Sequence, residues 1–339
     1  LSGFIALNFL KKPEIAESHF ARVIKLARKQ VNLSKVYYWY GRSLVQLNRS
    51  KEAKNAFEVG SKNTSTFYGQ LSAERIKKKD VSINQVSDHE FNCKSESIIQ
   101  NEIVRVGILL LKADRIVLGV RFFKHAAETL ENKERICLLK LLYDLENWSG
   151  VIAVAKKFIQ EDKVMFQYSY PILDLVQDKL KAPLSLVYAT IRQESEFYSA
   201  ASSSTGALGL MQVMPKTAQY LAKRVGLEYE KNRMLKDKYY NIKLGTQYLT
   251  ELLRSFRGSI VLSVAAYNAG PGTVKKWIES YGDPRNKGID PLIWIEMIPY
   301  TETRNYVMHV LGNELVYRSI LSRDPIKFDR AKKNFGHKF

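Results

Sequence analysis

The stretch Leu184–Pro215, LSLVYATIRQESEFYSAASSSTGALGLMQVMP, indicates an apolar helix that ends in a glutamate and is followed by a polar loop. Leu184, Val187 and Ile191 recur at helical spacing, which predicts that one helix face packs inward. Glu194 stands near the helix end, where the macrodipole does not stabilise an acidic group. The following loop is rich in Ser, Ala and Gly, a composition typical of a closely folded backbone. This arrangement predicts a general acid with a raised pKa.

The length and composition of the chain predict a globular protein of two domains. At 339 residues it exceeds one ordinary hydrophobic core, and its apolar fraction of 45% is that of a soluble protein. No apolar run approaches the eighteen residues of a membrane span. The first residues lack an initiator Met and a leading cationic region, so we expect the chain to begin inside its parent, which is compatible with a removed signal peptide.

The formal net charge of +19 predicts an anionic partner or surface. The candidates are nucleic acid, acidic lipid headgroups and a carboxylate-bearing polymer such as peptidoglycan. We do not expect nucleic acid, because no groove-entering module is recognisable in the sequence. No metal-ligand cluster or nucleotide-binding loop is recognisable either, so we expect no cofactor and no metal.

The periodicity along the chain predicts an all-α protein, with residues 1–177 as an α-helical superhelical solenoid and residues 178–339 as a second helical domain. In the first part, segments such as Val36–Leu47, Lys51–Gly60 and Arg115–Asn132 form helices with short joins. Helix pairs of this kind cannot each close a core, so they are expected to stack side by side. No fixed repeat period can be read. Lys77–Ser95 is polar and aperiodic, which predicts a loop.

Cys93 and Cys137 stand 44 residues apart, without metal-ligand spacing. A disulfide in an oxidising compartment and a pair of buried thiols both remain open.

Four motifs in the second half resemble those of the soluble lytic murein transglycosylase family, whose catalytic domain is similar to goose-type lysozyme. They are RQES at Arg192–Ser195, GALGLMQVMP at Gly206–Pro215, AAYNAGPG at Ala265–Gly272 and IPYTETRNYV at Ile298–Val307. The resemblance covers roughly residues 180–320, and extends more weakly to the helical first part. It implies a lysozyme-like helical catalytic domain over residues 178–339.

The resemblance also implies an activity. The family acts as a carbon–oxygen lyase, cleaving the β-1,4 bond between N-acetylmuramic acid and N-acetylglucosamine without water and leaving a 1,6-anhydro sugar. One glutamate suffices if Glu194 first protonates the leaving oxygen and then, as carboxylate, takes the proton of the muramic acid 6-hydroxyl. Glu196 is interpreted as a solvated surface group, and Glu296 as a helix-surface carboxylate. The implied location is the periplasm or cell envelope, and the solenoid is a possible contact for other envelope proteins.

The family's substrate-binding positions fall on residues of three segments. Gly206 and Gly209 suggest close approach or positive φ, Tyr267 is expected to hydrogen-bond or orient Glu194, and Glu302 matches a glutamate that receives the peptide stem. Met214 lines the groove or lies in the core, Tyr306 lines the groove or packs, and Asn268 fixes a loop or a sugar. The predicted set is Ser203, Gly206, Gln212, Met214, Tyr267, Asn268, Glu302 and Tyr306, with Glu194 catalytic.

Two other functions remain open at this point. A goose-type hydrolase would share the single-glutamate architecture and differ only in which hydroxyl reaches the intermediate first. An inactive peptidoglycan-binding scaffold would need no acid, so the presence of Glu194, Gln212 and Tyr267 speaks against it.

Overall fold

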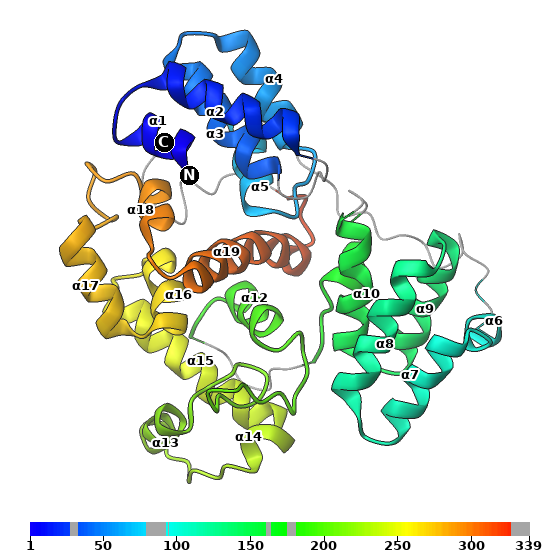
Figure 1. The fold of residues 1–339 in the computed structure, drawn as a ribbon. Coiled ribbons are helices and arrows are strands. Elements are labelled where there is room, and N and C mark those ends of the chain that lie inside the picture. Colours follow the sequence, from blue (N-terminus) through cyan, green and yellow to red (C-terminus); the bar gives the residue numbers. More distant parts are fainter. Residues whose placement is uncertain (28–32, 79–92, 94, 161–163, 175–180, 327–339) are drawn as a thin grey trace.

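The computed structural model describes residues 1–27, 33–78, 93, 95–160, 164–174 and 181–326, and this part of the chain is built from helices (Figure 1). Its only β pairing within these ranges is a pair of isolated bridges, Ser202 with Leu208 and Leu208 with Val213. The predicted all-α class is therefore confirmed. No described helix is both long and apolar enough to cross a membrane.

The first half contains eleven helices within the described ranges. They are α1 (Ser2–Asn8), α2 (Pro13–Leu26), α3 (Leu33–Gln46), α4 (Ser50–Gly60), α5 (Phe67–Arg75), α6 (Ser95–Ile99), α7 (Glu102–Lys112), α8 (Ile116–Thr129), α9 (Asn132–Asp144), α10 (Trp148–Gln160) and α11 (Phe166–Ser169). The predicted single helix Arg115–Asn132 is wrong at its end. The chain leaves the helix after Thr129, and α9 begins at Asn132 because Glu134 accepts a hydrogen bond from the Glu131 N–H at 3.0 Å.

The second half contains eight helices within the described ranges. They are α12 (Leu184–Glu194), α13 (Pro215–Arg224), α14 (Arg233–Lys236), α15 (Lys238–Ser255), α16 (Ile260–Ala269), α17 (Pro271–Tyr281), α18 (Pro291–Met297) and α19 (Thr301–Ser322). Local capping sets their ends: the Ser259 hydroxyl accepts from Leu262 N–H at the start of α16, and Gly270, at φ 84°, ends it.

Three helix pairs in the first half share one packing arrangement. A glycine of the first helix faces a phenylalanine ring of the second in α1–α2, α3–α4 and α7–α8. The pairs are Gly3 with Phe20, Gly41 with Phe57, and Gly107 with Phe123, and a Cβ on each glycine would lie 3.0, 2.6 and 2.4 Å from the ring. The glycine and the phenylalanine of each pair are sixteen or seventeen residues apart in the chain. This recurring spacing is a weak repeat, although no fixed period can be read from the sequence. It supports the expected stacking of helix pairs, while the solenoid itself stays a prediction.

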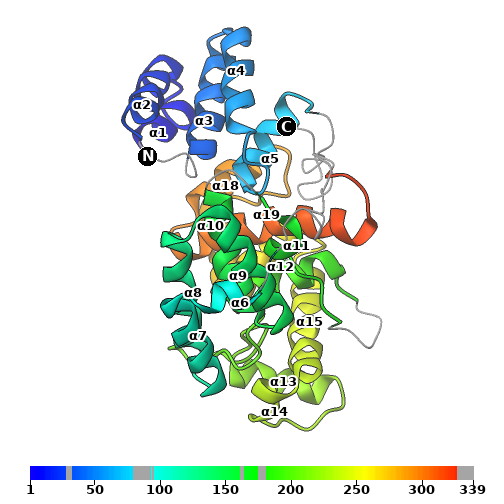
Figure 2. The same ribbon diagram turned by 90° about the vertical axis from the view of Figure 1, so that its right-hand side faces the viewer.

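The hydrophobic core is divided differently from the predicted domains. Apolar side chains of α1–α5 join those of α12–α19 in one continuous cluster, whereas most of those of α6–α10 form a second cluster; Ile152 of α10 belongs to the first. Figures 1 and 2 both show α1–α5 at one end of the molecule, beside α18 and α19, with α13 and α14 at the other. The predicted boundary at 177/178 lies outside the described residues and stays a prediction.

Polar contacts also join the first helices to the second half. Glu296 of α18 accepts a hydrogen bond from the Tyr68 hydroxyl and pairs with Lys35 Nζ at 2.7 Å, and its side chain is only 8% exposed. Arg42 pairs with Asp290 at 2.9 Å. The interpretation of Glu296 as a surface carboxylate is therefore wrong. The helix α18 directs Glu296 toward α3 and α5, and its partners there lie more than two hundred residues away in the chain.

A disulfide joins Cys93 to Cys137, which lies in the second hydrophobic cluster. Of the two states left open by the sequence, the structure thus has the disulfide. The predicted loop Lys77–Ser95 lies mostly outside the described residues.

Candidate active site

Glu194 is the last residue of α12, as predicted. The helix ends there because Glu196 and Phe197 adopt left-handed φ values of 49° and 64°. The hydroxyl of Ser195 donates to the Leu210 carbonyl at 2.8 Å and so fastens this turn to the following loop. The acid therefore sits where a buried helix stops against a loop.

The carboxyl of Glu194 is half-buried and accepts a hydrogen bond from a tyrosine. The Tyr306 hydroxyl, from the second turn of α19, donates to Oε1 at 2.6 Å. Burial raises the pKa of Glu194 to about 7, with a smaller increase from the charge of Glu302, while the Tyr306 hydrogen bond lowers it. A carboxyl with this pKa exists in both protonation states near neutral pH, as a group that first donates and then accepts a proton requires.

Of the two roles expected for Tyr267, the hydrogen bond to Glu194 is wrong, and orientation of Glu194 stays a prediction. The Tyr267 hydroxyl donates instead to the Met211 carbonyl at 2.8 Å, so it braces the loop beside the acid. Its ring is buried, and burial together with the nearby Glu194 raises its pKa well above the ordinary value. Tyr306, for which lining and packing were open, packs at 5% exposure and is the residue that holds the acid.

The loop between α12 and α13 is held by its own amides and by one side chain of α15. Gln212, at φ 45°, donates from Nε2 to the carbonyls of Ala201 and Gly209 at 3.1 and 2.7 Å. Asn241 donates to the carbonyls of Leu208 and Met234 and accepts from the Met211 N–H. The amide nitrogen of Gln212 thus bonds within the loop, and the substrate role of Gln212 stays a prediction.

Gly206 and Gly209 both have positive φ, but the space around them differs. Gly209, at 75°, is closed in: an added Cβ would lie 2.2 Å from the Met234 carbonyl oxygen and from Asn241 Nδ2. Gly206, at 92°, has open space at that position. Ser203 turns the chain beside it, because its hydroxyl accepts from the Ala207 N–H at 2.9 Å. These backbone conformations and contacts make the loop compact, but they do not identify a ligand.

The remaining predicted residues surround the same region. Met214 is 43% exposed at the start of α13, which excludes the core alternative for it. Asn268 accepts from Thr303 Oγ1 at 2.6 Å and so links the end of α16 to the start of α19. Glu302 is exposed in the first turn of α19, where its charge acts on Glu194.

Several residues that hold the site were not predicted. Asn241 clamps the loop, and Lys156 of α10 pairs with Glu196, two residues after the acid. No local pattern marks either one, because each contact joins segments at least thirty residues apart in the chain. In the described part of the chain, no group of three or more His, Cys, Asp and Glu is arranged to hold a metal ion.

Comparisons with known proteins find similar sequences and structures. Residues 175–289 match the sequence profile described as the transglycosylase SLT domain. A soluble lytic murein transglycosylase of Escherichia coli strain K12 is 29% identical over 302 residues, covering 85% of this chain and 44% of that protein. The one from Salmonella typhimurium is 37% identical over 140 residues, covering 41% of this chain and 21% of that protein.

Solved structures agree over the whole fold. The 70 kDa soluble lytic transglycosylase of Escherichia coli superposes with a TM-score of 0.76 at 25% identity, covering 100% of this chain and 53% of that one. An inactive mutant of the lytic transglycosylase Slt from Pseudomonas aeruginosa gives 0.75 at 26% identity, covering 96% and 52%. The chain thus spans about half the length of these relatives, and the predicted resemblance is confirmed.

Proposed function

We propose that this chain, a member of the soluble lytic murein transglycosylase family, cleaves the β-1,4 bond between N-acetylmuramic acid and N-acetylglucosamine in peptidoglycan and leaves a 1,6-anhydro end. The observation that carries the proposal is the half-buried carboxyl of Glu194, with a pKa of about 7 and a hydrogen bond from Tyr306. The names of the relatives, which describe murein transglycosylases, support the same chemistry.

The proposed reaction uses one residue twice. Protonated Glu194 gives its proton to the glycosidic oxygen, the bond from that oxygen to C1 of the muramic acid breaks, and the alcohol leaves. The substrate's acetamido group stabilises the oxocarbenium-like centre. The 6-hydroxyl then bonds to C1 and gives its proton to the Glu194 carboxylate, which restores the acid without consuming water. A second carboxylate, as in ordinary glycosidases, is not needed.

Glu196 is a poor candidate for such a second carboxylate, because it is directed to Lys156 by the left-handed turn. This supports the single-glutamate proposal over a two-carboxylate mechanism. A goose-type hydrolase would use the same residues. Only the product shows whether the 6-hydroxyl or a water molecule attacks C1.

The test is product analysis on purified sacculi. We expect the wild type to release anhydro-muramic acid ends, seen by mass spectrometry, and Glu194→Gln to release none while still binding sacculi. Reducing muramic acid ends would identify a hydrolase. Equal product release by Glu194→Gln would overturn the assignment of the acid, and binding without cleavage by the wild type would indicate a scaffold.

The proposed location is the periplasm or cell envelope. The disulfide between Cys93 and Cys137 supports an oxidising compartment, and the substrate lies in the envelope. Association with other envelope proteins through the first helices stays a prediction.

A further inference from the structure

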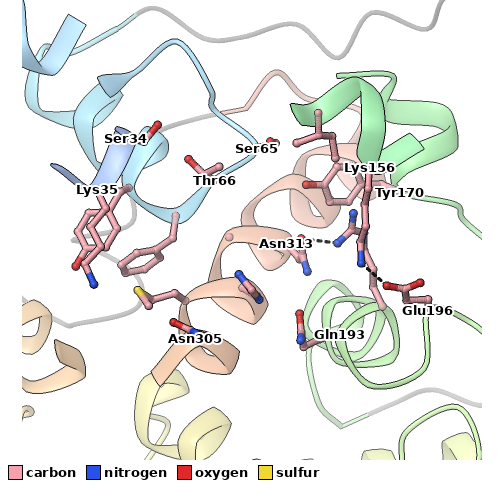
Figure 3. A pocket seen from close by; sticks show the side chains of 17 residues that line it. Ser34, Lys35, Ser65, Thr66, Lys156, Tyr170, Gln193, Glu196, Asn305 and Asn313 are labelled. Atoms are coloured by element: carbon pink, nitrogen blue, oxygen red, sulfur yellow. Dashed lines mark hydrogen bonds and ion pairs between the residues drawn. The ribbon is translucent and has the colours of Figure 1, made fainter. Parts of the chain in front are cut away.

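A cavity of about 430 Å³ opens beside the proposed active site, between α3 and α5 on one side and α10, α12 and α19 on the other (Figure 3). Its volume lies within the range of about 300–1,000 Å³ that is usual for ligand sites. Gln193 and Asn305 line it, and they are the chain neighbours of Glu194 and Tyr306. Neither Glu194 nor Tyr306 lines it, so the cavity adjoins the segments of α12 and α19 that carry the acid and its tyrosine.

Arg192 contributes a buried positive charge to the cavity wall. The residue is 8% exposed, and all the partners that the structure gives it are neutral. Nε donates to the Ser169 carbonyl at 2.8 Å, Nη1 donates to Asn313 Oδ1 at 3.2 Å, and the guanidinium lies 4.5 Å from the ring centre of Tyr170. Within the described residues no carboxylate forms an ion pair with it. A buried charge without a counter-charge is costly, so the site favours an anion.

Asn313 adds a second donor at the same wall, as Figure 3 shows. Its Oδ1 accepts from Arg192, and its Nδ2, in a side chain 5% exposed, has no hydrogen-bond partner in the described part of the chain. Buried amide nitrogens are rarely left unpaired. The neighbouring carboxylate of Glu314 is buried too, but it accepts from Ser185 Oγ at 3.0 Å.

The charges around the cavity are mainly positive. Lys35, Lys156 and Arg192 line it against a single carboxylate, Glu196, which pairs with Lys156. Lys35 pairs with Glu296. His309 faces this positive field: partial desolvation, Lys156 and Arg192 hold the pKa of this exposed residue below its ordinary value. The cavity thus combines positive potential with one unused donor, the Asn313 amide nitrogen.

We propose that this cavity is a subsite for a carboxylate of the peptide stem carried by the glycan strand. The proposal rests on the proposed function. Asn305 and Asn313 are eight helical residues apart on α19, about 12 Å at 1.5 Å per residue. An extended peptide covers that distance in about four residues at ~3.3 Å each. A stem attached to a sugar at Glu194 therefore reaches Arg192 with a carboxylate of its distal part.

The test places a negative charge in the cavity through an exposed residue, because removal of buried Arg192 is expected to disturb α12. The variant is His309→Glu, with Lys112→Gln as the control. Lys112→Gln lowers the net charge by the same one unit at the end of α7, away from the cavity lining. Cleavage of stem-bearing glycan strands and of strands whose stems an amidase has removed is followed by product chromatography, and thermal melts report folding.

We expect the wild type and Lys112→Gln to show a KM about tenfold lower for stem-bearing than for stem-free strands, the effect of one charged hydrogen bond. His309→Glu should lose most of this difference. An unchanged ratio in a folded His309→Glu, or no preference in the wild type, overturns the subsite. Failure of the wild type to cleave either strand overturns the proposed function instead.

A second measurement covers the case in which His309→Glu does not fold. Free stem peptide released by the amidase is added to the wild type cleaving stem-bearing strands. Competitive inhibition that vanishes when the peptide carboxylates are amidated supports the subsite. Inhibition by both forms, or by neither, overturns it.

Discussion

The hydroxyl of Tyr306 donates a hydrogen bond of 2.6 Å to the carboxyl of Glu194, joining the second turn of α19 to the last residue of α12. This bond stabilises the carboxylate and therefore lowers the pKa of Glu194, whereas burial raises it. The proton affinity of the acid is set by the balance of these two effects.

Tyr306→Phe should raise the pKa of Glu194 further, because it removes the interaction that lowers it. We expect the alkaline limb of the kcat profile, near pH 7 in the wild type, to move upward. The loss of orientation should lower kcat by about 10- to 100-fold. The control is Tyr267→Phe, which loses a hydrogen bond to Met211 and not to Glu194. Its limb should stay in place, and equal shifts in both variants would contradict the assignment.

Glu194→Gln should stabilise the protein above neutral pH. The folded pKa of about 7 exceeds the ordinary 4.5, so the stability that the neutral carboxyl contributes is full below pH 4.5 and is lost as pH rises through about 7. Glutamine stays neutral throughout. We expect the variant to exceed the wild type by about 1–3 kcal/mol at about pH 8, with the gap closing by about pH 4.5, in urea unfolding at both pH values. A gap independent of pH would refute the raised pKa.

Gly209→Ala should be much more damaging than Gly206→Ala. Both residues have positive φ, which costs an alanine about 1 kcal/mol. At Gly209 the new Cβ would also lie 2.2 Å from the Met234 carbonyl oxygen, so we expect a loss of about 3 kcal/mol or more. Thermal melts of the two variants compare them directly. Equal losses would mean that the loop does not pack on α14 and α15 as described.

Loss of the disulfide should weaken the α6–α10 cluster selectively. Closing a 44-residue separation contributes about 3–4 kcal/mol in the chain-entropy description. We expect Cys93→Ala with Cys137→Ala, or a reductant on the wild type, to lower the stability of this cluster, read by hydrogen exchange of α9 amides. Amides of α12 belong to the other cluster and serve as the internal control. Uniform loss of protection would show that the two clusters unfold together.

Features encoded within a few residues were predictable. The position of the acid at the end of α12 follows from the apolar periodicity that precedes it, and the structure has it there. The positive φ of Gly206 and Gly209 was predictable too, because glycine is the residue that adopts positive φ without steric cost in a tight loop.

Contacts between distant segments were not predictable. Tyr306 lies 112 residues from Glu194, and no local pattern distinguishes it from Tyr267 as the partner of the acid, because each phenol belongs to a motif expected near the carboxyl. The sequence alone places Glu296 on the surface because nothing in its own helix reports that Tyr68 and Lys35 cover it. Only the tertiary arrangement decides such cases.

The sharing of one core by α1–α5 and α12–α19 has a consequence for synthesis of the chain. The apolar faces of the first helices, and the Gln70 amide that donates to the Gly312 carbonyl at 3.0 Å, find their partners only when α19 has left the ribosome. Contacts over such sequence separations form late, after a large loss of chain entropy. The beginning of the chain therefore completes its folding last, and its exposed apolar surface must be protected from aggregation until then.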